Sequence, residues 1–452
     1  MKPKIAIAGA TGFIGKWFID KFHDQIDIVA LSRKEHSNES ISGVKWRTCD
    51  LYSLSSTIEA LSEVDYALYL VHSMSPSTKL NQGNFEDTDL LLADNFARAA
   101  EECKLKQVVY VGGILPKEDM NLSRHLKSRH EVENTLMARN TPVTTLRAGI
   151  IIGPGGSSFN IVKKLVERLP VMACPRWCQS LSQPIDIDDV LHIIIKTLGN
   201  HDFYDRAIEI GGNETISYMD LLKNTARIMG KKRLIFSVPF FTLGLSKLWV
   251  GLFSDSSPKL VSPLVESLRH DMTLESSLRY PFDIKYTNFD DSIKKALTKK
   301  NPSLLGKTIH RKIENTVRSV QRLPNPARIP IETIAREYPN WLQRLFGYII
   351  SVKQKGDILY FSLAGINLLI LKYVAKRSDD QRQLFYITGG QLAKRTDYGW
   401  LEFRSVLKNE SVIAAIHEFI PRLPWTVYKI TQAKVHLWVM NQFGRHIQKK
   451  AA

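Results

Sequence analysis

The sequence has few cysteines and no apolar run long enough to span a membrane. Only four cysteines occur in 452 residues, so the fold does not rely on a disulfide framework. The longest uncharged stretches, such as Ile358 to Leu371, fall short of the about 20 apolar residues that a bilayer requires. Because Met1 to Lys4 leads straight into a strand-like pattern, we expect no signal peptide and a cytoplasmic location.

Two further classes of site have little support in the sequence. Cys174 and Cys178 have neither a second cysteine pair nor neighbouring histidines, so we expect no metal site. We find no zinc knuckle and no RNA-binding aromatic motif, and we therefore expect no nucleic-acid partner.

The net charge of +17 is unevenly distributed. Residues 301–452 hold 24 Lys and Arg against 10 Asp and Glu, a balance of +14, whereas the remainder holds 38 against 35. This asymmetry indicates a second module, with either a basic binding preference or a solvated basic surface. Lys434, Arg445 and the tail Gln448 to Lys450 suggest peripheral contact with an anionic membrane, at its inner face.

The first fifteen residues carry the clearest pattern in the chain. Ile5 and Ile7 read as a buried strand, and Gly9, Gly12 and Gly15 follow at G-x-x-G-x-x-G spacing before a helix begins. The first glycine allows a tight turn, the second lets a pyrophosphate approach, and the third lets the helix pack near the sheet. Free N–H groups at the helix start attract phosphate. We therefore predict a dinucleotide-binding loop rather than an ordinary strand–turn–helix connection.

The end of the next strand, Ile26 to Arg33, indicates which dinucleotide is bound. NAD-specific folds usually place an acidic residue here for the ribose 2′-hydroxyl, whereas this chain has Ser32 and Arg33. These two can pair with a 2′-phosphate, which a carboxylate would repel. We expect NADP(H), with NAD(H) as the alternative if Arg33 merely faces solvent.

Strand patterns alternate with helical ones through the first 300 residues. Strands are expected at Val44 to Leu51, Tyr66 to Ser73, Gln107 to Gly113 and Thr144 to Ile152, with a helix at Phe85 to Lys104. This alternation predicts an α/β fold with a doubly wound parallel sheet of Rossmann type.

These patterns together resemble the atypical, extended short-chain dehydrogenase/reductase superfamily, an epimerase-like group. The resemblance rests on the Gly9 to Gly15 loop, Asp50-Leu51, Arg147 to Gly155, Gln183 to Val190 and Glu209 to Gly212. Tyr69 to Met74 and Leu169 to Met172 are similar to bacterial NAD(P)-binding proteins with an appended C-terminal ligand-binding-like domain. The resemblance implies that the cofactor contacts Gly9, Thr11, Gly12, Phe13, Ile14, Gly15, Ser32, Arg33, Asp50, Leu51, Leu70, Val71, His72 and Gly112.

The sequence departs from this superfamily at the catalytic positions. Active members use a serine after the fifth strand and a Tyr-x-x-x-Lys pair on the next helix. Here the serine region reads Gly112-Gly113, and His125 and Arg129 replace the tyrosine and lysine. These two are the catalytic candidates, because Arg129 supplies a pH-independent charge and histidine can transfer a proton near neutral pH. Alternatively, His125 is a packing or solvent-facing residue.

Extended members of the superfamily place the substrate against a small lobe that follows the sixth strand. The candidate cleft residues are Arg147, Arg176 and Trp177, with Asp186 or Asp188 orienting them. The apolar stretch Phe236 to Phe253 is either lobe packing or a lip for an apolar substrate or a membrane surface.

The C-terminal segment has a different pattern. After a Pro-punctuated linker, a short helix at Glu332 to Glu337 precedes several strand-like runs and a long helix at Trp425 to His446. Such an α+β domain, an antiparallel sheet with a long helix, resembles the helix-grip (START-like) domains that bind apolar ligands. A packed module without a cavity is the alternative.

We therefore expect an NAD(P)-binding domain at residues 1–298, a linker at 299–330 and a basic helix-grip-like domain at 331–452. One functional hypothesis is an NADP-dependent reductase of a small apolar, lipid-like or quinone-like substrate. The other is a non-catalytic NADP(H)-binding redox sensor or scaffold, a role that the missing triad favours.

Overall fold

A computed structural model of the chain describes residues 2–36, 41–72, 81–116, 122–238, 265–302, 308–309, 316–394 and 399–450. The chain forms two compact units. The first unit comprises Met1–Ser75 and Asn95–His310, and the second comprises Pro76–Asp94 and Arg311–Ala452.

The first unit contains a seven-stranded parallel sheet, which confirms the doubly wound prediction. Its strands are β1 (Lys4–Ala8), β2 (Asp27–Ser32), β4 (Val44–Thr48), β5 (Tyr66–Tyr69), β7 (Gln107–Gly113), β8 (Val143–Ala148) and β13 (Arg206–Ile210). Their spatial order is β13-β8-β7-β5-β1-β2-β4. Ile5 of β1 pairs with Ile28 of β2 on one side and Tyr66 of β5 on the other. The strand order reverses there, and ligands of open parallel sheets bind at such a point.

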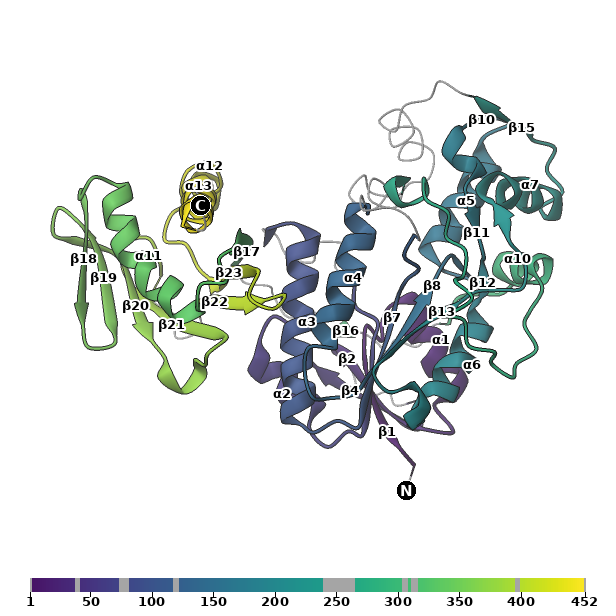
Figure 1. The fold of residues 1–452 in the computed structure, drawn as a ribbon, viewed down its shortest axis with the longest axis horizontal. Helices are drawn as coiled ribbons and strands as arrows, with labels where there is room; N and C mark the ends of the chain where they lie inside the picture. Colours follow the sequence, from purple (N-terminus) through teal and green to yellow (C-terminus); the bar gives the residue numbers. More distant parts are fainter. Residues whose placement is uncertain are drawn as a thin grey trace. The chain divides into compact units, whose positions relative to one another are not determined.

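Helices cover both faces of this sheet. They are α1 (Phe13–Phe22), α2 (Leu54–Leu61), α3 (Phe85–Glu102), α4 (Arg124–Leu136) and α6 (Ile187–Thr197). Figure 1 shows α3 and α4 on one side of the sheet, with α1 and α6 on the other. Ile7, Phe18, Leu68, Val109 and Ile193 are fully buried in the core between α1, α6 and the strands. The burial of this continuous apolar stripe stabilises the layered arrangement.

The expected substrate lobe follows β8. It contains α5 (Ser157–Arg168), β10 (Val171–Pro175), α7 (Tyr218–Ile228), β15 (Leu234–Val238) and α10 (Phe289–Thr298), with the 3-10 turns Arg176–Gln179 and His201–Phe203. Short pairs join β3 (Glu35–His36) to β16 (Thr308–Ile309), β9 (Ile151–Ile152) to β12 (Ile185–Asp186), and β11 (Leu181–Ser182) to β14 (Ile216–Ser217). Ser217 accepts a hydrogen bond from the Asp220 N–H and caps α7. Most of the stretch Phe236 to Phe253, from residue 239 onward, lies outside the described residues.

The second unit contains the predicted sheet and long helix. Its strands are β6 (Asn81–Gln82), β17 (Val317–Pro324), β18 (Ile350–Lys355), β19 (Ile358–Leu363), β20 (Ile366–Tyr373), β21 (Arg382–Gly389), β22 (Trp400–Val406) and β23 (Ser411–Phe419). They lie in the order β18-β19-β20-β21-β22-β23-β17-β6, with antiparallel pairs except the parallel pair of β17 and β6. The helices α11 (Ile331–Leu345), α12 (Trp425–Ile430) and α13 (Gln432–Lys449) contribute to one apolar core with the strands.

Three segments of the second unit differ from the sequence-based expectation. Val317–Pro324, expected within a linker, is a strand between β23 and β6. The short helix expected to end at Glu337 continues through Pro339 to Leu345. The single long helix expected at Trp425 to His446 is divided at Thr431, whose φ of −117° and ψ of −89° are not helical.

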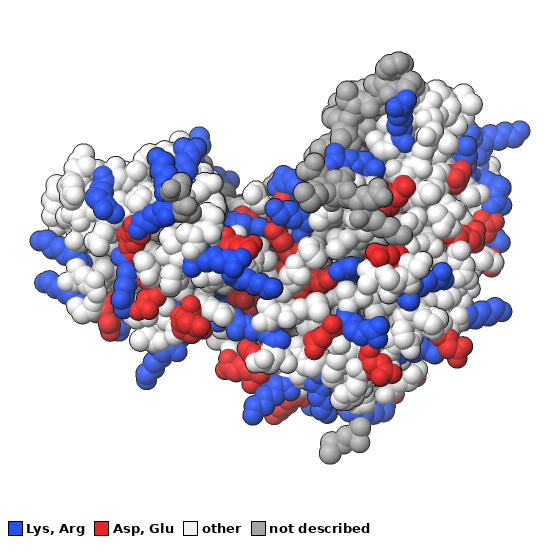
Figure 2. All heavy atoms as spheres, in the orientation of Figure 1, with Lys and Arg blue, Asp and Glu red and all other residues white. Residues whose placement is uncertain are grey.

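No helix among the described ranges combines the length and apolar character needed to cross a bilayer. The basic side chains do not gather in a single patch on the face drawn in Figure 2. Lys and Arg side chains are spread over both units there, with Asp and Glu side chains between them.

Candidate functional site

The glycine loop between β1 and α1 has the geometry expected of a phosphate cradle. Gly9 has φ of +94°, and a Cβ there would lie 2.8 Å from the Leu70 carbonyl oxygen. A Cβ on Gly15 would lie 2.5 Å from the Gly9 carbonyl oxygen. Gly12 caps α1 without a side-chain hydrogen bond, so no capping side chain occupies the first N–H groups of the helix. Thr11 is exposed, whereas Phe13 and Ile14 are half-buried.

The carboxyl end of β2 places the two predicted 2′-phosphate residues differently. Arg33 is exposed. Ser32 is buried, and its Oγ lies 2.7 Å from Nε2 of His36 and accepts a hydrogen bond from the Lys34 N–H at 3.1 Å. Burial lowers the pKa of His36, and Lys34 lowers it further. Arg33 is therefore the group of this pair that reaches solvent. No local pattern in the sequence indicates that His36 pairs with Ser32.

Asp50 and Leu51 form a turn after β4. Oδ1 of Asp50 accepts a hydrogen bond from the Tyr52 N–H at 3.3 Å. The Leu51 carbonyl oxygen accepts one from Nδ2 of Asn95 at 2.8 Å. These bonds fix the turn beside the same carboxyl edge of the sheet as the glycine loop, because the strands are parallel.

His72, His125 and Arg129 lie together, although they are far apart in the sequence. Nη2 of Arg129 lies 2.8 Å from Nδ1 of His72, and Nη1 donates to the Val71 carbonyl oxygen at 3.4 Å. Because arginine is only a donor, Nδ1 of His72 accepts this bond. The ring centroids of His72 and His125 are 5.1 Å apart. Arg129, only 7% exposed, thus holds the segment after β5, the segment that contains Leu70, Val71 and His72.

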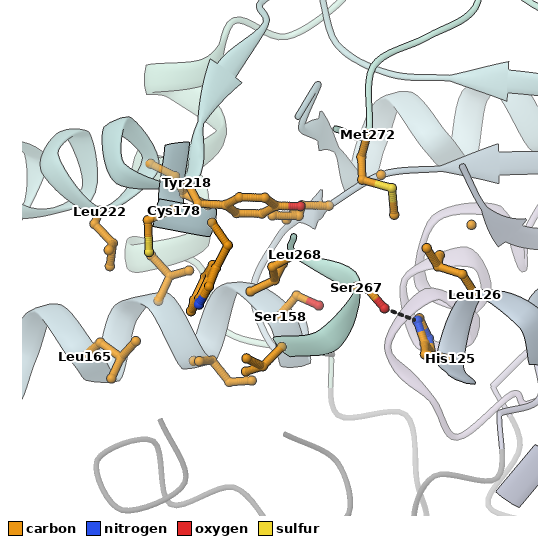
Figure 3. A pocket seen from close by; sticks show the side chains of 18 of the residues that line it. His125, Leu126, Ser158, Leu165, Cys178, Tyr218, Leu222, Ser267, Leu268 and Met272 are labelled. Carbon is orange, nitrogen blue, oxygen red and sulfur yellow. Dashed lines mark hydrogen bonds between the residues drawn. The ribbon is translucent and has the colours of Figure 1, made fainter. Parts of the chain in front are cut away.

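An apolar pocket, hereafter the lobe pocket, opens beside this cluster. Its empty space is about 1090 Å³ including the open mouth. Gly113, at the end of β7 directly after Gly112, lines it together with His125, while Leu165, Trp177 and Leu222 belong to its apolar part. Figure 3 shows His125 and Ser267 at one end, with Leu165, Cys178 and Leu222 toward the other. The pocket therefore has a polar end near the sheet and an apolar remainder.

The polar end is organised by a chain of hydroxyl groups. Nδ1 of His125 lies 3.4 Å from Oγ of Ser267, which lies 2.7 Å from Oγ of Ser123. Ser123 also accepts a hydrogen bond from the Leu126 N–H and caps α4. His125 therefore sits in the first turn of a fixed helix, with its imidazole against the pocket.

Two buried thiols lie at the apolar end of the lobe pocket. Cys174 and Cys178 both line it and are free. A hydrogen bond from Cys178 lowers the pKa of Cys174, while the same bond and burial raise the pKa of Cys178. Among the described residues, no three His, Cys, Asp or Glu side chains converge as metal ligands.

The other residues proposed for the cleft divide into two groups. Trp177 lines the lobe pocket, whereas Arg176 is exposed. Nε and Nη2 of Arg147 bind the carboxylate of Glu133 at 3.0 and 2.6 Å, which links β8 to α4. The two remaining candidates, Asp186 and Asp188, lie 3.1 and 2.7 Å from Nζ of Lys295. These ion pairs join structural elements of the first unit.

A family model matches the N-terminal part of the chain. Residues 5–121 match the model of the NAD dependent epimerase/dehydratase family. Over 115 residues the chain is 33% identical to the auxiliary protein GraX of Staphylococcus aureus. That match covers 25% of this chain and 37% of GraX, well under two thirds of the relative's length.

Solved structures show the same fold for the first unit. Two structures of triphenylmethane reductase from Citrobacter sp. match at TM-scores of 0.50 and 0.51, the second being a complex with NADP(H). They are 17% and 16% identical, cover 66% and 65% of this chain, and are themselves covered over 100% and 99% of their lengths. Residues 5–121 are thus similar to the NAD dependent epimerase/dehydratase family, and the parallel sheet of the first unit has the Rossmann fold of these solved structures.

Proposed function

We propose that the first unit is an NADP(H)-dependent reductase of an uncharged, mainly apolar carbonyl or quinone-type substrate. The observation that carries this proposal is the lobe pocket, which is apolar over most of its surface and opens beside Gly113 and His125. Both residues lie at the carboxyl edge of the sheet, where the glycine loop is found. NADP(H) in complex with the similarly folded triphenylmethane reductase supports the choice of cofactor.

The residues of the first unit fit a dinucleotide. Gly9, Gly12 and Gly15 let the loop backbone pack closely at the start of α1, whose N–H groups suit a pyrophosphate, and the exposed Arg33 at the end of β2 suits a 2′-phosphate. When bound there, a reduced nicotinamide supplies hydride. His125 holds a proton at the polar end of the pocket and can deliver it to the substrate oxygen, with Ser267 orienting the imidazole. Arg129 is a positioning residue that fixes His72.

Turnover of NADPH by the purified full chain tests this function. NADPH consumption would be followed with a panel of quinones and aldehydes of increasing apolar size. Leu222→Trp should fill the pocket and lower kcat/KM at least tenfold without weakening NADPH binding, since Leu222 lies in the apolar part. Leu234→Trp is the matched control, because Leu234 is 61% exposed.

His125→Phe should lower kcat about 100-fold, a typical contribution of a general acid. An unchanged kcat in this variant would show that His125 is not the proton donor, even if the protein turns over NADPH. Arg129→Met should lower kcat because methionine cannot hydrogen-bond His72. Arg129→Lys should retain a higher kcat than Arg129→Met, because lysine can still donate a hydrogen bond to His72.

A non-catalytic NADP(H)-binding sensor or scaffold is the second candidate. It is favoured by the absence of the family's tyrosine and lysine and by the contacts that hold their replacements, His125 and Arg129. Tight NADPH binding without consumption across the whole panel would support this function over the reductase.

We also propose that the second unit contacts anionic membranes through its basic surface. The support is its charge, with Lys434 and Arg445 exposed on α13. Sedimentation with phosphatidylglycerol vesicles should then be lost as salt rises from low to physiological concentration. Equal binding to neutral phosphatidylcholine vesicles would contradict an electrostatic contact.

A further inference from the structure

The second unit contains a cavity of its own, independent of the lobe pocket. This sheet–helix cavity has an empty space of about 1040 Å³ including its mouth. It lies among β17 to β23, α11, α12 and α13, and its apolar lining includes Leu342, Phe361, Leu371, Leu401 and Met440. Cavities with such linings exclude water and accept apolar molecules.

The polar groups of this lining are few and specific. Ser319, Gln432 and His436 line the cavity, together with Tyr338 and Tyr428. Gln432 and His436 are four residues apart on α13 and therefore share one face of the helix. Nε2 of His436 lies 3.2 Å from Oγ of Ser319.

Gln432 presents a hydrogen-bond acceptor that the described residues leave unused. Its Nε2 donates to the Leu392 carbonyl oxygen at 3.4 Å, which orients the amide. Its Oε1 is buried, and no hydrogen-bond partner for this atom occurs in the described part of the chain. A buried carbonyl oxygen without a partner is costly, so a bound molecule that donates a hydrogen bond there would relieve the cost.

The lining also excludes charged ligands. None of the described residues that line the cavity is Asp, Glu, Lys or Arg. Burial lowers the pKa of His436 to about 4, so its imidazole is neutral at physiological pH. A carboxylate or ammonium group would therefore lose its hydration without gaining an opposite charge.

We propose that the sheet–helix cavity is a second ligand site, which binds an uncharged, mainly apolar molecule whose hydroxyl group donates a hydrogen bond to Oε1 of Gln432. A hydroxyl group fits because it donates to Gln432 and can also accept from the Ser319–His436 pair beside it. The site does not depend on the function proposed for the first unit, because every group that defines it belongs to the second unit.

Three probes with the same number of carbon atoms separate the contribution of the alkyl chain from that of the head group. Dodecane, 1-dodecanol and dodecanoate would compete with the neutral fluorophore N-phenyl-1-naphthylamine on the full chain. The measurements use the Leu222→Trp background, in which the lobe pocket is filled. The alcohol should displace the fluorophore at a lower concentration than either the alkane or the carboxylate. Equal displacement by alcohol and alkane would overturn the hydroxyl assignment, and absence of fluorophore binding would overturn the site.

Substitution of the proposed acceptor provides the sharper test. Gln432→Leu keeps the side-chain size but removes Oε1, so 1-dodecanol binding should weaken roughly three- to tenfold while dodecane binding stays the same. Gln448→Leu, the matched change at an exposed position of α13, should alter neither. The same effect in both variants would contradict the proposal.

A second readout covers the case in which the Leu222→Trp background does not fold. Val435 lines the cavity but is 51% exposed, so Val435→Trp should obstruct the mouth without disturbing the core. Native mass spectrometry should show less 1-dodecanol bound to this variant than to the protein without any substitution. Unchanged occupancy would place the alcohol elsewhere.

Discussion

At the scale of single residues, we predict that the preference between NADPH and NADH depends on Arg33. Arg33→Ala should weaken NADPH binding about tenfold and NADH binding less than twofold, because only NADPH carries the phosphate that a guanidinium binds. Fluorescence titration with both dinucleotides measures the difference. Arg176→Ala, which removes another exposed arginine of the first unit, should change neither affinity. A loss that is equal for the two dinucleotides would mean that Arg33 only faces solvent.

Some contacts of the candidate site can be predicted from the sequence, and others cannot. His125 and Arg129 were found because they occupy positions of a known motif, and the structure brings both to His72. The hydrogen bond between Ser267 and His125 joins residues that are 142 positions apart, so no local sequence pattern predicts it. The ion pair that Arg147, a candidate cleft residue, forms with Glu133 on α4 likewise has no local pattern in the sequence.

At the scale of elements, the glycine loop depends on close backbone contact. Gly15→Ala would place a Cβ 2.5 Å from the Gly9 carbonyl oxygen and 2.8 Å from Cα of Ala10. The loop must then shift, which should lower the free energy of unfolding by about 2 kcal/mol and abolish NADPH binding. Urea unfolding and dinucleotide titration measure the two effects.

The matched control for the loop is Gly444→Ala, on α13. A Cβ there would have no neighbour nearer than 3.4 Å, and alanine favours helix more than glycine does. This variant should therefore keep or raise stability and leave NADPH binding intact. If Gly15→Ala behaved in the same way, the close approach would not be needed for the cofactor.

Element boundaries were predicted well where periodicity was strong and poorly where packing overrides propensity. Phe85 to Lys104 was expected as a helix, and α3 covers Phe85–Glu102. Pro339 normally interrupts a helix, yet α11 continues past it because Ile334, Tyr338 and Trp341 bury one apolar face. Tertiary burial of this kind cannot be read from a local pattern.

At the scale of the whole molecule, buried charges tie a distant segment into the second unit. Nη1 of Arg404 lies 2.7 Å from Oδ2 of Asp94, and Nη2 lies 3.1 Å from Oε2 of Glu402. Arg382 and His417 also bind Glu402, at 2.6 and 3.1 Å. Although burial alone would raise the pKa of Glu402, the two arginines hold it well below its ordinary value. The free-energy cost of burying each of these charges is therefore offset only when the others are present.

This network predicts that residues 299–452 do not form a stable unit by themselves. The fragment lacks β6 and Asp94, so Arg404 would be buried without its partner on α3. We expect no cooperative urea transition in the isolated fragment. In the full chain, Asp94→Asn should lower the free energy of unfolding by about 3–5 kcal/mol. Glu410→Gln should cost less than about 1 kcal/mol, because its ion pair with Arg328 is exposed. A fragment that unfolds cooperatively would show instead that the sheet of the second unit is stable without Pro76–Asp94.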